Sequence, residues 1–356
     1  MIRKNLFAAW ILCLLTIPHS APAQDEVPRY FVFGDRRPFE QCHASTLTRL
    51  DDGNYLVAWF GGTAESNDDV GIWLSRGKAD RWSEPAEIAK VRNDAHWNPV
   101  LFRDREGIVY LFFKVGKKID RWETWLVTSS DGGKTWSAPT ELVKGDRGGR
   151  GPVRNKPVIL SDGTWLAGAS VENSRRRKWD IFTDRSADRG QTWEATPFIA
   201  LDRAHFEGEG VIQPTLWEST PGQVHLLARS TNGKIYRSDS NDYGRTWSAL
   251  YDTGLPNPNS GIDLVRLSDG TLALVYNPDG RNWGPRNMLK VAVSHDNGRT
   301  WQDKLTLEQE PEKDDAGNEL EYSYPAIVCS DHTVALTYTW RRRRIVFREI
   351  PEAFFK

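Results

Sequence analysis

Residues Ser129–Trp136 read SSDGGKTW, and this octapeptide decides the fold because three other segments repeat its pattern. The copies are SADRGQTW at Ser186–Trp193, SNDYGRTW at Ser240–Trp247 and SHDNGRTW at Ser294–Trp301. Each copy suits a tight turn, in which Asp accepts backbone N–H groups, Gly adopts a positive φ, and Thr and Trp begin the next strand. Four copies of one turn predict four repeats of one structural unit.

The spacing of these turns gives the size of the unit. The tryptophans that end the four octapeptides are 57, 54 and 54 residues apart, and a decayed copy ending at Trp82 lies 54 residues earlier. Asp-Gly pairs at residues 52–53, 162–163 and 269–270, each flanked by apolar or alternating runs, predict a second hairpin in the repeats. A repeat of about 50 residues with four short strands is typical of a β-propeller blade.

The number of units predicts the whole architecture. Five tryptophan-marked units leave residues 321–349 for one more blade, and the strand around Tyr30–Phe33 is expected to complete it. We therefore predict an all-β fold, a six-bladed β-propeller with four antiparallel strands per blade, formed as a single domain by residues 24–356. The five marker tryptophans are expected at equivalent blade positions: Trp82, Trp136, Trp193, Trp247 and Trp301.

The N-terminus has the pattern of a secretory signal peptide. Two basic residues precede an apolar stretch from Leu6 to about Ile17, and Ala21–Ala23 provides a small-x-small cleavage site. The apolar stretch is too short to span about 30 Å of hydrocarbon. We expect residues 1–23 to be removed and the mature chain to be secreted or periplasmic, without a membrane anchor.

Charge and cysteine content limit the partners. A formal net charge of -1 gives no global field that would indicate nucleic acid or a membrane as a partner. Neither His nor Cys shows metal-ligand spacing, so no metal and no other cofactor is expected, and we expect a monomer. Cys42 and Cys329 are expected either to pair, tying an early strand to a late one, or to remain buried thiols.

The candidate site follows from the fold. In a propeller the innermost strand of each blade starts near the central channel, so the residues that open these strands converge. The expected openings are Cys42–Ser45, His96–Pro99, Arg154–Pro157, Ile212–Thr215, Asn259–Asp263 and Tyr322–Pro325. All six are polar, and they contribute Asn98, Gln213 and Asp263 as candidate substrate-binding residues. The alternative is that these groups satisfy one another beside a water-filled channel.

With its octapeptide turns, the chain resembles the sialidase superfamily with Asp-box repeats over almost the whole mature sequence. That family binds a substrate carboxylate with three arginines, protonates the leaving oxygen with an Asp, and attacks the anomeric carbon with a Tyr that a Glu activates. The resemblance implies an exo-acting glycoside hydrolase that releases a terminal acidic sugar, sialic acid or a related one, from a glycan.

Individual residues can be matched to this pattern. Arg229, at the end of an apolar strand, is similar to the family's second arginine, and Arg286 is similar to the third. Asp69 lies in the loop where the family carries its acid, with Asp68 and Glu65 as alternatives.

The nucleophile is left open between two tyrosines. Tyr322 and Tyr324 are two residues apart in an extended strand, so they are expected to face the same side. Glu209 approximates the activating Glu, although its register is off by two or three residues.

One position departs from the family. Its first arginine is replaced by His43, which leaves the carboxylate clamp incomplete. His43 and His96 open adjacent blades, and Arg154 and Lys156 open the next one. The pocket is therefore expected to hold two titratable imidazoles beside a cationic wall, with Arg154 or Lys156 able to complete the clamp.

This departure leaves two alternatives to a hydrolase. If the substrate is a uronic acid, a cation that neutralises its carboxylate acidifies the neighbouring proton, and a His or Tyr base can then eliminate the 4-substituent. His43, His96 and Tyr324 would serve such a polysaccharide lyase. The second alternative is a noncatalytic glycan-binding propeller. Ultraviolet absorbance of an unsaturated product would identify elimination.

Overall fold

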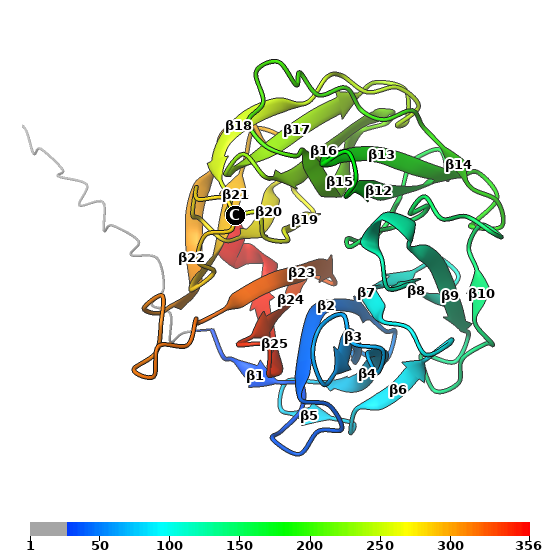
Figure 1. Ribbon diagram of the computed structural model, residues 1–356, viewed down its shortest axis with the longest axis vertical. Coiled ribbons are helices and arrows are strands. Elements are labelled where there is room, and N and C mark those ends of the chain that lie inside the picture. The colour runs from blue at the N-terminus through cyan, green and yellow to red at the C-terminus, as the bar shows by residue number, and fades with distance from the viewer. Residues whose placement is uncertain (1–26) are drawn as a thin grey trace, which may run out of the picture.

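The computed structural model describes residues 27–356, so the expected signal peptide, residues 1–23, lies outside the described residues. Six sheets stand around a central axis as the blades of a propeller (Figure 1). The fold predicted from the octapeptide repeat is therefore confirmed. No helix among the described residues is long and apolar enough to cross a membrane.

Each blade runs from an inner strand beside the channel to an outer strand at the rim. The first blade contains β2 (Gln41–Arg49), β3 (Tyr55–Gly62), β4 (Gly71–Lys78) and β5 (Arg81–Trp82), with β6 (Ala86–Ala89) also pairing with β4. The second contains β7 (His96–Arg103), β8 (Val109–Val115), β9 (Glu123–Ser129) and β10 (Thr140–Glu141). The third contains β11 (Val158–Ile159), β12 (Trp165–Asn173), β13 (Lys178–Ser186) and β14 (Glu194–Ala195).

The remaining blades follow the same order. The fourth contains β15 (Val211–Thr220), β16 (Gln223–Ser230), β17 (Lys234–Ser240) and β18 (Tyr251–Pro256). The fifth contains β19 (Asp263–Arg266), β20 (Leu272–Tyr276), β21 (Met288–Ser294) and β22 (Gln302–Gln309). The sixth contains β23 (Tyr322–Ser330), β24 (Thr333–Trp340), β25 (Arg344–Pro351) and β1 (Tyr30–Phe31). Two short 3₁₀ helices are η2 (Ile119–Arg121) and η3 (Glu352–Phe355).

The ring is closed by pairing between the two ends of the chain. Strand β1 pairs with β25, with Tyr30 opposite Phe347 and Phe31 opposite Val346. The N–H of Val32 extends this ladder by donating to the Ile345 carbonyl at 2.9 Å. The predicted completion of the last blade by the N-terminal strand is thus confirmed, and it covers an edge that would otherwise stay unpaired.

The octapeptide turns lie where the sequence places them, between the third and fourth strands of their blades. In the first of them, Asp131 accepts the N–H groups of Lys134 and Thr135 at 3.0 and 2.9 Å, and the Ser129 hydroxyl accepts the N–H of Gly133. Gly133 has a φ of 82°. All five marker tryptophans therefore hold equivalent positions, either in this connection or at the start of the fourth strand, as predicted.

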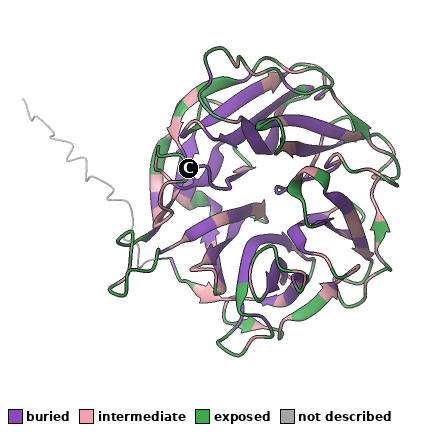
Figure 2. Ribbon diagram, viewed as in Figure 1, coloured by how far each residue is buried: buried purple, intermediate pink, exposed green. Residues whose placement is uncertain are grey.

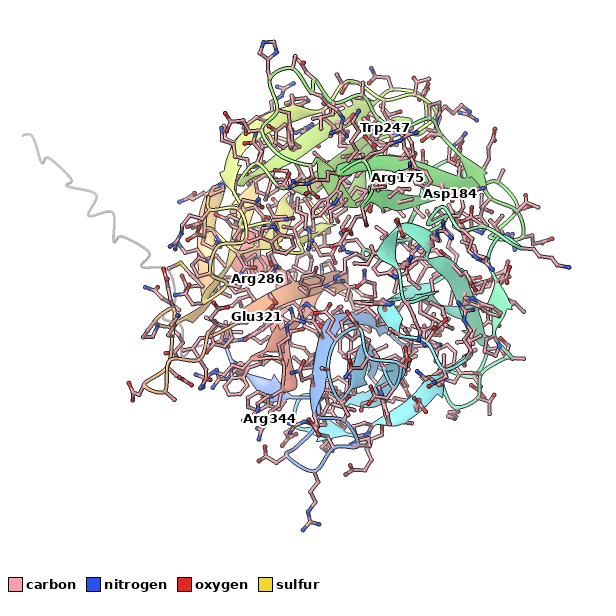
Figure 3. The ribbon with its side chains drawn as sticks, in the orientation of Figure 1. Arg175, Asp184, Trp247, Arg286, Glu321 and Arg344 are labelled. Atoms are coloured by element: carbon pink, nitrogen blue, oxygen red, sulfur yellow. The ribbon has the colours of Figure 1, made fainter. Side chains whose placement is uncertain are left out.

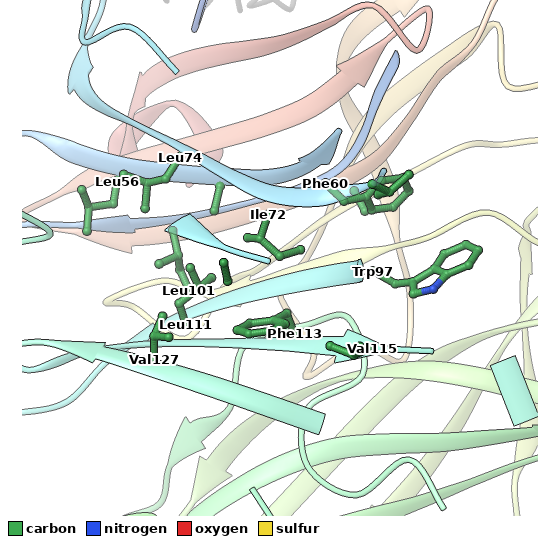
Figure 4. Packing of buried hydrophobic residues seen from close by; sticks show 14 of the residues in the cluster. Leu56, Phe60, Ile72, Leu74, Trp97, Leu101, Leu111, Phe113, Val115 and Val127 are labelled. Atoms are coloured by element: carbon green, nitrogen blue, oxygen red, sulfur yellow. The ribbon is translucent and has the colours of Figure 1, made fainter. Parts of the chain in front are cut away.

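The core lies between neighbouring blades. Leu56 and Ile72 of the first blade face Leu101 and Leu111 of the second (Figure 4), and these side chains are at most 1% exposed. The long inner strands β2, β7, β15 and β23 are mostly buried, whereas the rim strands are more exposed (Figure 2). Polar side chains at the inner strands are therefore placed in a buried environment by the fold itself.

The two cysteines remain free thiols. Cys42 is the second residue of β2, whereas Cys329 is the second-last residue of the neighbouring inner strand β23. Since every inner strand begins at the same end of the propeller, these residues lie at opposite ends of their strands. The expected disulfide therefore does not form. Both cysteines are free thiols, Cys42 buried and Cys329 partly buried.

Phe33 follows the closing strand β1 and packs against the first blade. Replacing this side chain tests how much the contact stabilises the closed ring. The Phe33 side chain is 6% exposed and lies 5.3 Å from Phe39 and 4.8 Å from Trp59 between ring centroids. Phe33→Ala should lower the free energy of unfolding by about 3 to 5 kcal/mol in urea denaturation. The exposed Phe198 provides the control, because Phe198→Ala should change it by less than about 0.5 kcal/mol. Equal effects of the two variants would contradict this closure.

Candidate active site

Four inner strands share one backbone distortion near their first residues. Ala44, Asn98, Gln213 and Tyr324 have φ values of 58°, 40°, 57° and 52°. At each of them the pairing with the second strand shifts in register. Such a bulge inserts a residue and re-aims side chains away from simple alternation. The predicted residues Asn98 and Gln213 thus occupy equivalent positions in the second and fourth blades.

Tyr324 lies at the centre of a cationic cluster. Its hydroxyl accepts a hydrogen bond of 2.6 Å from Nη1 of Arg229. The guanidinium carbons of Arg154, Arg229 and Arg286 lie 5.2, 5.4 and 5.7 Å from the centre of its ring. These arginines come from the third, fourth and fifth blades, so the propeller brings together groups that are far apart in the sequence.

Two of these arginines have unsatisfied donors. Arg154 is 1% exposed, and its Nη2 donates to the Pro325 carbonyl at 2.8 Å. Burial lowers the pKa of Arg154 to about 10. Arg154 Nε and Nη1 and Arg229 Nε are buried without a hydrogen-bond partner among the described residues, 27–356. Buried donors of this kind are rare, and an anion is the ligand that would satisfy them.

Glu321 holds the third arginine in place. Its carboxylate accepts from Arg286 Nη1 at 3.0 Å and from Arg342 Nε at 2.7 Å (Figure 3). Burial alone would raise the pKa of Glu321, but the guanidinium groups of Arg342 and Arg286 keep that pKa well below its usual range. Glu321 is therefore an anion at neutral pH and positions both arginines. No sequence pattern indicated this role, because Glu321 lies one residue before the expected strand opening at Tyr322–Pro325.

A cavity of about 510 Å³ adjoins this ion pair. Its lining includes Arg286, Glu321, Arg342 and Trp283, a residue that sequence reasoning missed. Trp283 is 62% exposed, so a large apolar surface borders the charged groups. A sugar ring carries both apolar faces and polar edges, which suits such a lining.

His43 packs directly on Tyr324, with 4.1 Å between the ring centroids. Its Nδ1 lies 3.0 Å from the Thr339 hydroxyl, and its buried Nε2 has no hydrogen-bond partner in the part of the chain that the structure describes. Burial and the nearby Arg342 lower the pKa of His43 well below 6.5. The imidazole is therefore neutral at neutral pH, with one nitrogen available to a ligand or a proton.

Both ring nitrogens of His96 form hydrogen bonds with the backbone of the loop that precedes it. Its Nε2 accepts the N–H of Val91 at 2.8 Å, and its Nδ1 lies 2.8 Å from the Asp94 carbonyl. Burial lowers the pKa of His96 to about 4. Both nitrogens are occupied, so the structure gives His96 a structural role and does not bring it to Tyr324.

The two tyrosines do not face the same side, and that expectation is wrong. The bulge between Ser323 and Ala326, with its positive φ at Tyr324, breaks the strand's alternation. Tyr322 is 1% exposed, packs in the core between the last two blades, and its hydroxyl accepts from Arg341 Nε at 3.1 Å. Only Tyr324 reaches the arginine cluster.

Lys156 and Asp263 bind each other across the channel, at 2.8 Å between Nζ and Oδ2. The same carboxylate accepts from the Thr215 hydroxyl and from the N–H of Ile327, at 2.9 Å each. Asp263 thus ties together strands of four blades. This pair stabilises the ring, and neither residue is free to bind a substrate carboxylate.

The loop that carries the expected acid lies at the rim of the mouth. Asp69 is exposed and accepts from the N–H and hydroxyl of Thr63 at 2.8 and 3.0 Å. The alternatives Asp68 and Glu65 form ion pairs, Asp68 with a lysine of the neighbouring loop and Glu65 with Arg342. No hydrogen bond joins any of these carboxylates to Tyr324.

Near Arg229 the structure shows a different carboxyl group. Glu209, the expected activating residue, forms an ion pair of 2.9 Å with Arg177 at the surface. The side chain of Glu172, the second-last residue of β12, has neither an ion pair nor a hydrogen bond within residues 27–356. Burial raises the pKa of Glu172, against an opposing effect of Arg229. A charged residue at the end of a strand looks like a surface position in the sequence, so Glu172 was missed.

Among residues 27–356, no three or more His, Cys, Asp or Glu side chains are grouped so that they could hold a metal ion. The candidate site is therefore described by arginine, tyrosine, histidine and glutamate side chains alone.

Comparison with known proteins gives a family and a fold. The model of a family described as "BNR repeat-like domain" matches residues 53–336. A sialidase of Paraclostridium sordellii is 25% identical over 203 residues, which cover 49% of this chain and 48% of that protein. A sialidase of Clostridium perfringens is 26% identical over 164 residues, which cover 41% of each chain. The matches span less than half the length of these relatives.

Solved structures agree with the propeller fold. A protein of unknown function from Dyadobacter fermentans has a TM-score of 0.72 at 14% identity, covering 91% of this chain and 97% of that one. The K499G mutant of NanB sialidase from Streptococcus pneumoniae has a TM-score of 0.69 at 14% identity, covering 92% and 70%. Trypanosoma rangeli sialidase in complex with sialic acid has a TM-score of 0.65 at 14% identity, covering 88% and 54%. At these identities the likeness shows the fold alone.

The raised pKa of the half-buried Glu172 predicts a pH-dependent stability. Because its pKa is raised in the folded protein, folding holds the proton more tightly than the unfolded chain does, so wild-type stability falls as pH rises above the ordinary value of 4.5. Glu172→Gln removes the ionisable carboxyl group, so the variant does not lose this stability as the pH rises. Urea denaturation should show the variant to be more stable than wild type at pH 8, with the difference shrinking toward pH 5.

Glu209→Gln is the matched control, because it removes a surface ion pair and should cost at most about 1 kcal/mol. A Glu172→Gln variant less stable than wild type at pH 8 would contradict this reading of the site.

Proposed function

The chain belongs to the BNR repeat-like domain family, and from this premise we propose that it is an exported sialidase-type glycoside hydrolase. It acts on an acidic glycan and releases the terminal acidic sugar, sialic acid or a related one. The sialidase names of two curated relatives support the reaction class. The chain's own residues support the substrate class.

The observation that carries the proposal is the arginine cluster around Tyr324. Three guanidinium groups surround one phenol ring, and two of them retain buried donors without a partner. A guanidinium presents a rigid fork of N–H groups that matches a carboxylate. A sugar with a carboxylate beside its anomeric carbon would satisfy these donors and bring that carbon to Tyr324.

Tyr324 is the proposed nucleophile. A neutral phenol suits a carbon that bears a carboxylate, because attack by an anion would be repelled. Its oxygen forms a bond to the anomeric carbon as the glycosidic bond breaks, and its proton passes to Nε2 of His43. Negative charge that develops on the oxygen is stabilised by the hydrogen bond from Arg229. Water then hydrolyses the glycosyl-tyrosine and returns the enzyme.

The leaving oxygen needs a proton from a carboxylic acid. Asp69 is the acid that the family resemblance indicates. Glu172 is the acid that the structure favours, because its raised pKa keeps it protonated at higher pH and its carboxyl lies near Arg229.

A polysaccharide lyase is the second candidate, and His43 is the observation that favours it. Within residues 27–356, the Nε2 of its neutral imidazole has no hydrogen-bond partner, and no carboxylate forms a hydrogen bond with Tyr324 as an activating Glu would. With a uronic acid in the site, the arginines would neutralise the carboxylate. His43 or Tyr324 would then remove the neighbouring proton while the 4-substituent leaves.

Substitutions in the cluster should separate catalysis from folding. Tyr324→Phe should lower kcat by about 10³-fold or more, because the variant lacks the reacting oxygen. Arg229→Ala and Arg286→Ala should each lower kcat/KM by about 10² to 10³-fold, the cost of losing a preorganised donor. Steady-state kinetics on acidic glycosides measures both.

Tyr322→Phe is the control for the nucleophile, since it removes the hydroxyl of the core tyrosine and should leave kcat within a few-fold of wild type. Near wild-type activity of Tyr324→Phe would overturn the proposed mechanism, whereas a wild-type protein that binds acidic glycans without cleaving them would favour a glycan-binding role.

The products decide between hydrolysis and elimination. A hydrolase releases one acidic sugar and consumes one water, and its products do not gain ultraviolet absorbance. A lyase forms a double bond conjugated with the carboxylate, which absorbs strongly. We expect sugar release without new absorbance from sialosides. Absorbance that rises with turnover on polyuronates would replace the hydrolase by the lyase.

A further inference from the structure

A second cavity opens on the same face of the propeller. Inner strands begin at the channel mouth, so the turns between second and third strands lie on that face as well. Two of these turns, η2 with its flanks and the turn between β12 and β13, border a cavity of about 650 Å³. Its lining consists of Asp120, Arg121, Asn173, Arg175 and Arg176.

The arginines of this cavity are not used by the fold. The side chains of Arg121, Arg175 and Arg176 are exposed and form neither an ion pair nor a hydrogen bond with any residue from 27 to 356. Neighbouring arginines differ, since Arg177 pairs with Glu209 at 2.9 Å. Asp120 is the single carboxylate of the lining, so the cavity keeps an excess of positive charge.

One strand, β12, links the lining of this cavity to the surroundings of Arg229. Asn173 ends β12 and directly follows Glu172. Glu172 interacts electrostatically with Arg229, whose Nη1 donates to Tyr324. Figure 3 places Arg175 on one side of the central opening and Arg286 with Glu321 on the other. A glycan whose terminal sugar lies over Tyr324 can therefore extend past Glu172 toward Arg175.

We infer that this cavity is a second anion subsite, which binds a carboxylate on a sugar further along the same glycan. The inference rests on the proposed function and narrows it, because the preferred substrate is then a polyanionic oligosaccharide rather than a glycan with one terminal acidic sugar. Guanidinium groups without a partner in the described chain can form strong, charge-assisted hydrogen bonds with the carboxylates of a polyanionic ligand. The exposure of these guanidinium groups makes such binding sensitive to ionic strength.

The test compares short and long acidic ligands on a protein that cannot cleave them. Calorimetric titration of Tyr324→Phe uses the methyl glycosides and the linear trimers of sialic acid and of galacturonic acid. For the sugar that the site accepts, the trimer should bind about tenfold tighter than the methyl glycoside. Raising the salt concentration should reduce this difference.

Arg175→Gln with Arg176→Gln, added to Tyr324→Phe, should abolish the preference for the trimer and leave methyl glycoside affinity unchanged. The matched control is Arg105→Gln with Arg299→Gln, which removes two exposed arginines from turns at the opposite end of the blades. This control should keep the tenfold preference.

Three results would overturn the inference. The first is a trimer that binds no tighter than the methyl glycoside, and the second is a preference that survives Arg175→Gln with Arg176→Gln. The third is a single-stranded DNA 12-mer that binds as tightly as the trimer, which would show that the arginines accept any polyanion. If neither sugar binds in any form, the proposed function itself fails and the subsite falls with it.

Discussion

The left-handed backbone at Tyr324 is the constraint on which the candidate site depends. A φ of 52° on a bulky aromatic residue costs about 1 to 2 kcal/mol, so the surrounding structure must hold it. The carbonyl of the next residue, Pro325, accepts a hydrogen bond from Arg154, and the Tyr324 hydroxyl accepts one from Arg229. The bulge aims the phenol at the arginines, and the arginines in turn hold the bulge. Without it, Tyr324 would follow Tyr322 toward the core.

The candidate site concentrates positive charge in a protein whose net charge is nearly zero. The chain carries a formal net charge of -1, yet guanidinium groups gather at the channel mouth, with Glu321 positioning one of them. His43 is kept neutral by burial and by these cations, so it adds a proton acceptor without adding charge. Deeper in the channel, Asp263 joins four blades and closes the ring behind the site. The ion pairs and hydrogen bonds of Asp263 therefore support a preorganised cluster of positive charge, which is what the proposed binding of an acidic sugar requires.

The sequence predicted the repeated elements of the fold, but it did not predict features of the site that depend on contacts between residues far apart in the chain. The octapeptide spacing predicted the blade count, and the remaining chain length predicted that the N-terminal strand completes the last blade. The tyrosine pair failed because alternation was assumed across a bulge, although a proline after Asn98, Gln213 and Tyr324 marks three of the four distorted strands. The hydrogen bonds that His96 forms with its own loop, and the partial desolvation that raises the pKa of Glu172, depend on contacts that no local sequence pattern encodes.

The central claim is that the arginines around Tyr324 bind the carboxylate of a sugar, and a crystal structure with a 2,3-didehydro sugar acid tests it most directly. The account predicts that the ligand carboxylate forms hydrogen bonds with at least two of Arg154, Arg229 and Arg286, with the ring carbon that bears it above the Tyr324 hydroxyl. A ligand bound elsewhere, or bound at the mouth with its carboxylate turned away from all three arginines, would contradict the account.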